Sequence, residues 1–280
     1  MIGVFDSGVG GLSVWREIVA CIPDVSTAYL ADQAHVPYGE RSLDEVRELT
    51  LRAAGWLIER GCSAIVIACN TASAAALEDL RATFPDTPFV GMEPAIKPAA
   101  LCTQTGTIGV LATAGTFGSR RYASLVTRWG RHVSIIQQPC RGWVNAVERI
   151  SACAKRPAQL ARLVASCVVP LLDQNADVLV LGCTHFPFLR PWIEQTIEAW
   201  RGEHPTAHDV KIIDPAPAVA RRTHQVLSQL ASARARGGSA RGFSPGGATH
   251  EFWTTGSADT FAQVASVLLG YRVATQSVAL

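Results

Sequence analysis

The chain has 280 residues, of which 48% are hydrophobic and 17% are charged, and its 25 basic and 23 acidic residues leave a formal charge of +2. A chain of this length and apolar content can bury a large core and corresponds to about two domains, so the composition excludes intrinsic disorder. The balanced charge argues against nucleic-acid binding as the main task, because neutralising phosphates requires clustered basic residues.

Short β-branched runs alternate along the chain with longer helix-like segments. The predicted helix with the clearest ends covers residues 42–60, because Ser42 and Glu45 have the spacing of a capping box and Gly61 suits a helix end. This alternation predicts an α/β fold with mostly parallel sheets covered by helices on both faces. The predicted strands are residues 2–5, 27–31, 64–68, 89–92, 107–112, 133–137, 177–182 and 210–213.

Residues 232–249 interrupt this pattern, because they are rich in Gly, Ser and Arg and show no periodicity. We interpret them as a surface loop. The three arginines of the segment could contact a nucleic acid, but scattered arginines more often form solvated surface. We therefore expect no nucleic-acid partner.

The N-terminal sequence lacks the basic segment of a signal peptide and reaches an acidic residue, Asp6, at once. The longest apolar stretch, residues 163–172, is interrupted by Ser166 and Pro170 and is too short to cross a bilayer. We therefore expect a cytoplasmic protein with no membrane contact.

Eight cysteines are spread through the chain, and no two of them have the C-x-x-C spacing of zinc or thioredoxin-type sites. We therefore expect neither a metal site nor a disulfide framework. Buried cysteines commonly serve as small hydrophobic residues, so a functional cysteine has to be identified from its local context.

Two segments resemble each other around Cys69 and Cys183. Residues 65–71 read IVIACNT and residues 179–185 read LVLGCTH, so that each has an apolar strand, a small residue, a cysteine and then polar residues that open a helix. The run IGVF near the N-terminus likewise resembles IGVL at residues 108–111. These two matches predict two related halves.

Cys69 and Cys183 each follow a predicted strand and precede a predicted helix, the position at which parallel α/β sheets bind ligands. The N-terminus of a helix stabilises a thiolate, and its free N–H groups can bind a carboxylate. Side chains that follow the two cysteines add hydrogen-bonding groups: Asn70, Thr71, Thr184 and His185.

Three kinds of chemistry could use such cysteines. A hydrolytic nucleophile needs one cysteine and an orienting partner, whereas a redox pair needs two sulfurs within bonding distance. Proton exchange at a carbon next to a carboxylate needs a base on one face and an acid on the other. Two equivalent thiols in related halves fit the third best. Asp6 would then lie beside Cys69 if the first and third strands are neighbours, and His185 could pair with Cys183.

Several segments, in this order along the chain, resemble the bacterial glutamate racemases. They are IGVFDSGVGGLSV at 2–14, VPYGERS at 36–42, IVIACNTASA at 65–74, EPAIKPA at 93–99, IGVLATAGT at 108–116, LVLGCTHFPFL at 179–189, DPAPAVARR at 214–222 and the tail at 252–270. The resemblance implies a cofactor-independent isomerase that interconverts L- and D-glutamate and supplies D-glutamate for peptidoglycan synthesis.

The resemblance also implies roles for individual residues. Cys69 would exchange the α-proton of the D-enantiomer and Cys183 that of the L-enantiomer. Glu148 best matches a second acid of the family, although Arg141 and Trp143 depart from the commoner pattern around it. The thiol assistants would be Asp6 and His185, and the substrate-binding residues would be Asp6, Ser7, Tyr38, Gly39, Asn70, Thr71, Thr184 and His185.

The fold implied by the resemblance consists of two pseudo-symmetric Rossmann-like domains with the active site in the cleft between them. The first domain would comprise residues 1–96 and 207–280, and the second, inserted into it, residues 97–206. Closure over the substrate would exclude water and align both thiols. The expected partner is the substrate, glutamate. Members of the family form dimers of different geometry, so a homodimer is possible, but no feature of the sequence decides the oligomeric state.

Two rival hypotheses stay open. Another racemase or a decarboxylase of the wider superfamily, for instance one acting on aspartate or hydantoins, would share the two cysteines. A non-catalytic carboxylate-binding or interaction protein, such as one acting on a topoisomerase as some family members do, would share the fold. The DSGVGG and GCTHFP sequences favour glutamate, and the intact pair of thiols favours catalysis.

Overall fold

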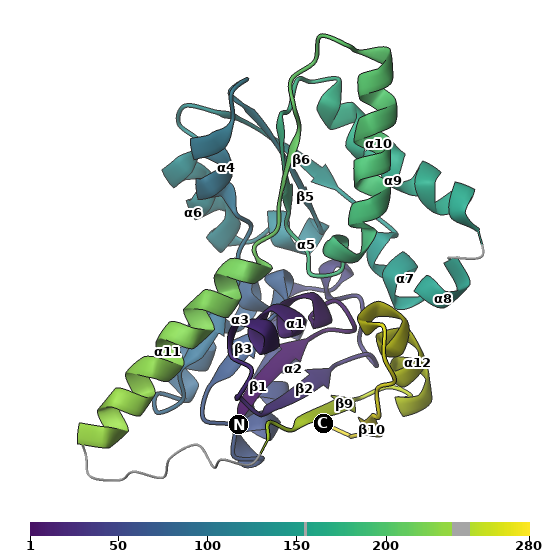
Figure 1. The fold of residues 1–280 in the computed structure, drawn as a ribbon. Coiled ribbons are helices and arrows are strands. Elements are labelled where there is room, and N and C mark those ends of the chain that lie inside the picture. The colour runs from purple at the N-terminus through teal and green to yellow at the C-terminus, as the bar shows by residue number, and fades with distance from the viewer. Residues whose placement is uncertain (154–155, 237–246) are drawn as a thin grey trace.

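The structure is a computed structural model that describes residues 1–153, 156–236 and 247–280. Its strands form a six-stranded sheet in the order β10-β9-β2-β1-β3-β4 and a four-stranded sheet in the order β6-β5-β7-β8 (Figure 1). Every pair of neighbouring strands within these ranges is parallel. The predicted α/β fold with parallel sheets is therefore confirmed.

All eight predicted strands are present, with small shifts at their ends. The first sheet also contains two strands that the sequence did not indicate, β9 and β10. Its strands are β1 (Ile2–Asp6), β2 (Thr27–Ala31), β3 (Ile65–Ile67), β4 (Phe89–Gly91), β9 (His250–Thr254) and β10 (Gln276–Ser277). The second sheet consists of β5 (Thr107–Ala112), β6 (Ser134–Pro139), β7 (Val178–Leu181) and β8 (Lys211–Ile213).

Helices pack against both sheets (Figure 1). The longer ones are α1 (Leu12–Cys21), α2 (Leu43–Glu59), α3 (Asn70–Thr83), α6 (Arg120–Trp129), α9 (Pro157–Leu172), α10 (Arg190–Glu203), α11 (Ala216–Arg236) and α12 (Ala258–Leu269). The shorter ones are η1 (Tyr38–Glu40), α4 (Ile96–Cys102), α5 (Ala114–Phe117), α7 (Trp143–Glu148), α8 (Ile150–Cys153) and η2 (Phe186–Leu189). No helix within the described ranges is long and apolar enough to cross a membrane.

The central strand β1 contributes side chains to two different cores. Val4 packs in a cluster with residues of α1, α11 and α12, whereas Phe5 packs in a cluster with residues of α2 and α3. Successive side chains of a strand point to opposite faces, so an all-apolar strand is stable only when both faces are covered. This explains why the strand runs are almost continuously hydrophobic.

Helix α2 begins as its sequence predicts. The Ser42 side chain accepts a hydrogen bond from the backbone N–H of Glu45 at 3.2 Å, and Gly61 follows the helix with a φ of +82°. A full capping box also needs the Glu45 carboxylate to accept from the backbone of Ser42. That carboxylate instead pairs with Arg41, so only half of the capping box forms.

The two halves repeat one pattern of strands. The order β2-β1-β3-β4 of the first sheet corresponds to the order β6-β5-β7-β8 of the second. Equivalent backbone hydrogen bonds of 2.7 Å end the two central pairs, from Ala68 to Phe5 and from Gly182 to Leu111. The next residues in the chain are Cys69 and Cys183. The cysteines therefore occupy equivalent positions in two related halves.

The chain returns to the first half later than the sequence suggested. The predicted return at residue 207 would place β8 with the first half, but β8 pairs with β7 in the second sheet. Helix α11 follows β8 and packs against α1. The return therefore comes after Ile213, and in its other respects the division into residues 1–96 plus 207–280 and 97–206 stays a prediction.

The segment predicted as a loop at residues 232–249 begins as a helix. Helix α11 continues to Arg236, so residues 232–236 are helical, which the run of Ala and Arg explains because both residues favour helix formation. Residues 237–246 lie outside the described ranges. From His250 the chain forms β9, which lies between β10 and β2 in the first sheet.

Candidate active site

The two equivalent cysteines lie at the carboxyl ends of β3 and β7. Cys69 is the N-cap of α3, and its Sγ accepts a hydrogen bond from the backbone N–H of Ala72 at 3.5 Å. Cys183 follows β7, but the helical turn after it, η2, begins only at Phe186 and is a short 3-10 turn. Both cysteines are buried, with 6% and 8% of their surface exposed. Only Cys69 therefore stands at the start of an α-helix.

Asp6 lies beside Cys69 because β1 and β3 are neighbours. The fully buried Asp6 carboxylate accepts hydrogen bonds of 2.9 Å from the backbone N–H of Gly8 and from the hydroxyl of Thr184. The next residue, Ser7, has its hydroxyl 3.9 Å from the Cys69 sulfur. Asp6 thus joins the Cys69 side of the site, in the first half, to the loop that carries Cys183 in the second.

On the other side of the site, Cys183 is the first member of a chain of polar contacts. Its sulfur lies 3.7 Å from Nδ1 of His185, and Nε2 of the same ring lies 2.7 Å from Oε1 of Glu148. The backbone N–H of Val9, in the first half, donates to the same carboxylate oxygen at 2.8 Å. The structure therefore places Glu148 against His185, and its role as a second acid stays a prediction.

Burial and neighbouring charges set the protonation of these groups. Burial raises the pKa of the Cys69 thiol well above its ordinary value, and the negative charges of Asp6 and Cys183 raise it further. Burial also raises the pKa of Asp6, an effect that the positive charge of His185 opposes. Burial acts to lower the pKa of His185, but contacts with Cys183 and Glu148 outweigh it and raise that pKa well above the ordinary value. A protonated His185 therefore faces Cys183, and Asp6, when ionised, adds negative charge beside Cys69.

The glycines after Asp6 allow the two halves to approach closely. A Cβ atom on Gly8 would lie 1.9 Å from Oε1 of Glu148, and one on Gly10 would lie 2.2 Å from Nδ1 of His185. Real Cβ atoms do not approach other atoms so closely, so an added Cβ would displace the Glu148 carboxylate or the His185 ring. The glycines at these positions thus allow the contact between the halves.

Replacing Gly10 with alanine should displace His185, because the added methyl group needs the space of the ring. We expect Gly10→Ala to lower catalytic turnover on the order of 100-fold, the typical effect of misplacing a reacting group by about 1 Å. Gly202→Ala is the matched control, since a Cβ on Gly202 meets nothing within 4 Å. Steady-state rates and circular dichroism of both variants check this, and wild-type turnover in a folded Gly10→Ala would contradict it.

Asn70 carries the one buried amide of the site that has no protein partner. Within residues 1–153, 156–236 and 247–280, neither Oδ1 nor Nδ2 of Asn70 has a hydrogen-bond partner, although the residue is only 3% exposed. A buried polar group without a partner costs free energy, which a hydrogen bond to a bound molecule would recover. The neighbouring Thr71 hydroxyl contacts that of Thr113 at 3.1 Å, in the second half. Asn70 is therefore available to bind a substrate next to Cys69.

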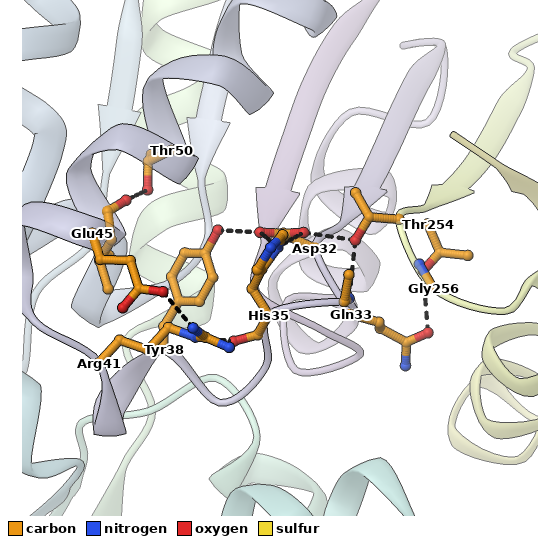
Figure 2. Close-up of polar contacts among 12 residues, drawn as sticks. Asp32, Gln33, His35, Tyr38, Arg41, Glu45, Thr50, Thr254 and Gly256 are labelled. Carbon is orange, nitrogen blue, oxygen red and sulfur yellow. Dashed lines mark hydrogen bonds and ion pairs between the residues drawn. The ribbon is translucent and has the colours of Figure 1, made fainter. Parts of the chain in front are cut away.

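Tyr38 and Gly39 lie where η1 meets the second half. The Tyr38 hydroxyl donates to Asp32 at 2.6 Å (Figure 2). A Cβ on Gly39 would lie 2.4 Å from Cβ of Thr113. Asp32 is buried and also accepts from the Thr255 hydroxyl at 2.6 Å. It holds Tyr38 in place, so the predicted substrate contact of Tyr38 is not made by a free hydroxyl.

The sequence analysis missed Asp32 and its neighbour Gln33. Asp32 directly follows β2 and lies beside Asp6, the last residue of β1, as the hydrogen bond of 3.0 Å from the backbone N–H of Asp32 to the backbone oxygen of Asp6 shows. An acidic residue after a second predicted strand was the signal that could have identified it. Gln33 carries no comparable signal, because its partner Glu148 lies in the other half, 115 residues away in sequence.

A cavity of about 570 Å³ opens between the halves next to this site. Gly39 and Thr113 form part of its wall, and charged residues from both halves also line it: Glu40, Arg41 and Arg141. The cavity has room for a small dicarboxylate, and its wall residue Thr113 contacts the Thr71 hydroxyl at 3.1 Å, whereas neither Cys69 nor Cys183 lines it. Among the residues described, no group of three or more His, Cys, Asp or Glu side chains is arranged to hold a metal ion.

Comparison with known proteins gives matches along the whole chain. Residues 2–223 match the model of the Asp/Glu/Hydantoin racemase family. The chain is 44% identical over 272 residues to the glutamate racemase of Pseudomonas paraeruginosa, a match that covers 96% of this chain and 94% of that protein. It is 46% identical over 228 residues to the glutamate racemase of Roseiflexus sp., covering 81% and 79%.

Solved structures agree with these relatives. A glutamate racemase isoform from Bacillus anthracis matches with a TM-score of 0.81 and 32% identity, covering 100% of this chain and 97% of that one. The Escherichia coli glutamate racemase, in complex with L-glutamate and the activator UDP-MurNAc-ala, matches with a TM-score of 0.77 and 30% identity, covering 99% and 97%.

The fold, the paired thiols and these matches define an isomerase of the racemase class. The chain belongs to the Asp/Glu/Hydantoin racemase family.

Proposed function

We propose that the protein is a glutamate racemase that interconverts L- and D-glutamate without a cofactor, using Cys69 and Cys183 as its two acid/base groups. The observation that carries this proposal is the placement of two buried thiols at equivalent ends of β3 and β7, each with its own ionisable assistant. The names of the relatives support glutamate as the substrate.

In the proposed reaction, the α-carbon of glutamate lies between the two sulfurs. In the L-to-D direction the Cys183 thiolate removes the α-proton, and the Cys69 thiol donates a proton to the opposite face of the resulting carbanion. The raised pKa of Cys69 suits this step, because it keeps the thiol protonated until the carbanion forms. The reverse reaction exchanges the two roles.

The polar groups around the thiols would bind the substrate's ionic groups. The Asn70 amide and the first N–H groups of α3 favour a carboxylate, because the start of a helix attracts negative charge. Ser7, Thr71 and Thr184 add hydroxyls from both halves. Binding would thereby draw the halves together and exclude water from the carbanion.

The proposal extends to the cell. D-Glutamate formed by this enzyme would supply peptidoglycan synthesis in the cytoplasm, and the chain would work alone or as a homodimer. The resemblance to bacterial glutamate racemases along most of the chain supports this role.

A substrate panel followed by circular dichroism tests the assignment. L-Glutamate, D-glutamate, both enantiomers of aspartate and a hydantoin are supplied separately, and the loss of optical activity is recorded. We expect racemisation of both glutamate enantiomers. Aspartate, whose side chain is one methylene shorter, should react at least roughly tenfold slower, and so should the hydantoin. Faster racemisation of aspartate or the hydantoin, or no reaction at all, would contradict the assignment.

A further inference from the structure

Glu148 belongs to the second half of the protein, but residues of the first half hold its carboxylate. The backbone N–H of Val9 donates to Oε1 at 2.8 Å, and the side-chain amide of Gln33 donates from Nε2 to Oε2 at 2.8 Å. His185 occupies the remaining position on Oε1 at 2.7 Å. Both oxygens of Glu148 are thus engaged, and Gln33 is the only side chain of the first half, within the described ranges, that contacts Oε2.

The orientation of Gln33 is itself fixed by strand β9. The Thr254 hydroxyl donates to Oε1 of Gln33 at 3.2 Å and accepts from the backbone N–H of Gly256 at 3.0 Å. A Cβ on Gly256 would lie 3.0 Å from Cβ of Gln33, so the backbone there packs closely on the side chain. Figure 2 shows Gln33 beside Thr254 and Gly256. The amide can therefore present only its N–H to Glu148.

We propose that Gln33 is a positioning residue for the Cys183 side of the racemisation. Gln33 would hold the Glu148 carboxylate, Glu148 would hold the His185 ring, and His185 would hold the Cys183 sulfur, at the distances of 2.8, 2.7 and 3.7 Å seen in the structure. This inference rests on the proposed function, because it assigns Cys183 one of the two proton transfers.

The contacts of Cys69 do not include this network. Its sulfur contacts Ser7 and the N–H of Ala72, and neither of these residues touches Gln33 among the hydrogen bonds of the described residues. A loss of Gln33 should therefore slow proton transfer at Cys183 and leave transfer at Cys69 nearly unchanged. A residue that only stabilises the fold would affect both thiols alike.

L- and D-glutamate have equal free energies, so kcat/KM stays equal in the two directions for every variant. A comparison of kcat/KM therefore cannot show which thiol is impaired, whereas isotope effects can. We expect Gln33→Leu to lower kcat/KM roughly tenfold. The α-deuterium isotope effect on kcat/KM should rise for L-glutamate, whose C–D bond is broken by Cys183. It should fall for D-glutamate, whose slow step becomes protonation by Cys183. Thr254→Val should shift both isotope effects in the same directions by less, and Thr254→Ser, which keeps the hydroxyl, should restore wild-type values.

The matched control is Gln263→Leu, the same substitution at an exposed position on α12, which should match the wild type. Wild-type kinetics for Gln33→Leu would overturn the proposal, as would a loss of activity that leaves the ratio of the two isotope effects unchanged. If Gln33→Leu fails to fold, the Thr254→Val and Thr254→Ser pair decides by the same ratio. Absence of racemisation in the wild type would instead contradict the proposed function, and this inference with it.

Discussion

Replacing either Cys69 or Cys183 with serine should nearly abolish racemisation, with turnover falling roughly 100- to 10,000-fold, the usual contribution of a positioned acid or base. A serine hydroxyl is nearly isosteric with the thiol but far less acidic, so it cannot supply the anion that removes an α-proton. The expected loss is the same in both directions for each variant, because each direction needs both groups. Circular dichroism of L- and D-glutamate solutions measures it.

Cys21→Ser is the control for this experiment, since Cys21 is exposed and lies at the end of α1, away from the paired thiols. It should retain the wild-type rate. If either Cys69→Ser or Cys183→Ser keeps near-normal turnover, the two thiols are not both acid/base groups and the two-base account is wrong.

Replacing Asp6 with asparagine should reduce turnover roughly 100-fold while keeping the fold. The asparagine Oδ1 can still accept from the N–H of Gly8, and its amide can donate to the Thr184 hydroxyl, so both hydrogen bonds of Asp6 can persist. The substitution removes the negative charge beside Cys69. Because burial and then the Asp6 charge raise the pKa of Cys69, this variant should lower that pKa and make the thiol ionise at lower pH.

Alkylation of Cys69 as a function of pH, followed by mass spectrometry, measures this shift. The midpoint of the alkylation profile should move to lower pH in Asp6→Asn than in the wild type. An unchanged or higher midpoint would show that the Asp6 charge does not act on Cys69.

The stability of Asp6→Asn should not fall at neutral pH. The pKa of Asp6 is raised in the folded protein, mainly by burial, so the folded state binds this proton more tightly than the unfolded chain does. Ionised Asp6 therefore costs stability above its unfolded pKa, and a neutral asparagine avoids that cost. Thermal unfolding near pH 7 should give an equal or higher midpoint. A clearly lower midpoint would mean that activity is lost through unfolding.

Much of the fold and of the thiol geometry was predictable because it depends on short stretches of sequence. Apolar runs predicted eight of the ten strands that the described residues form, all except β9 and β10, and the repeat around Cys69 and Cys183 predicted two related halves. The position of Asp6 beside Cys69 also followed, since adjacent parallel strands bring their carboxyl ends to one edge.

Other features depend on contacts between distant residues and could not be predicted in this way. Whether β8 joins the second sheet is decided by its pairing with β7, and its short sequence does not encode that choice. In the sequence, Gln33 is one polar residue of a loop. Its partners Glu148 and Thr254 become its neighbours only in the folded protein. The need for glycine at position 10 likewise comes from the close approach of His185, which lies 175 residues later in the sequence.

The use of a separate thiol on each face of the α-carbon is tested most directly by racemising L- and D-glutamate in D₂O with the wild-type enzyme. In each direction, one thiol removes the α-proton and the other thiol donates a proton to the product. The donating thiol has already exchanged its own proton for deuterium from the solvent. At early conversion, the product enantiomer should therefore carry deuterium at the α-carbon while the remaining substrate carries almost none, in both directions. Product that retains the substrate's proton, or equal labelling of substrate and product from the start, would contradict the two-thiol account.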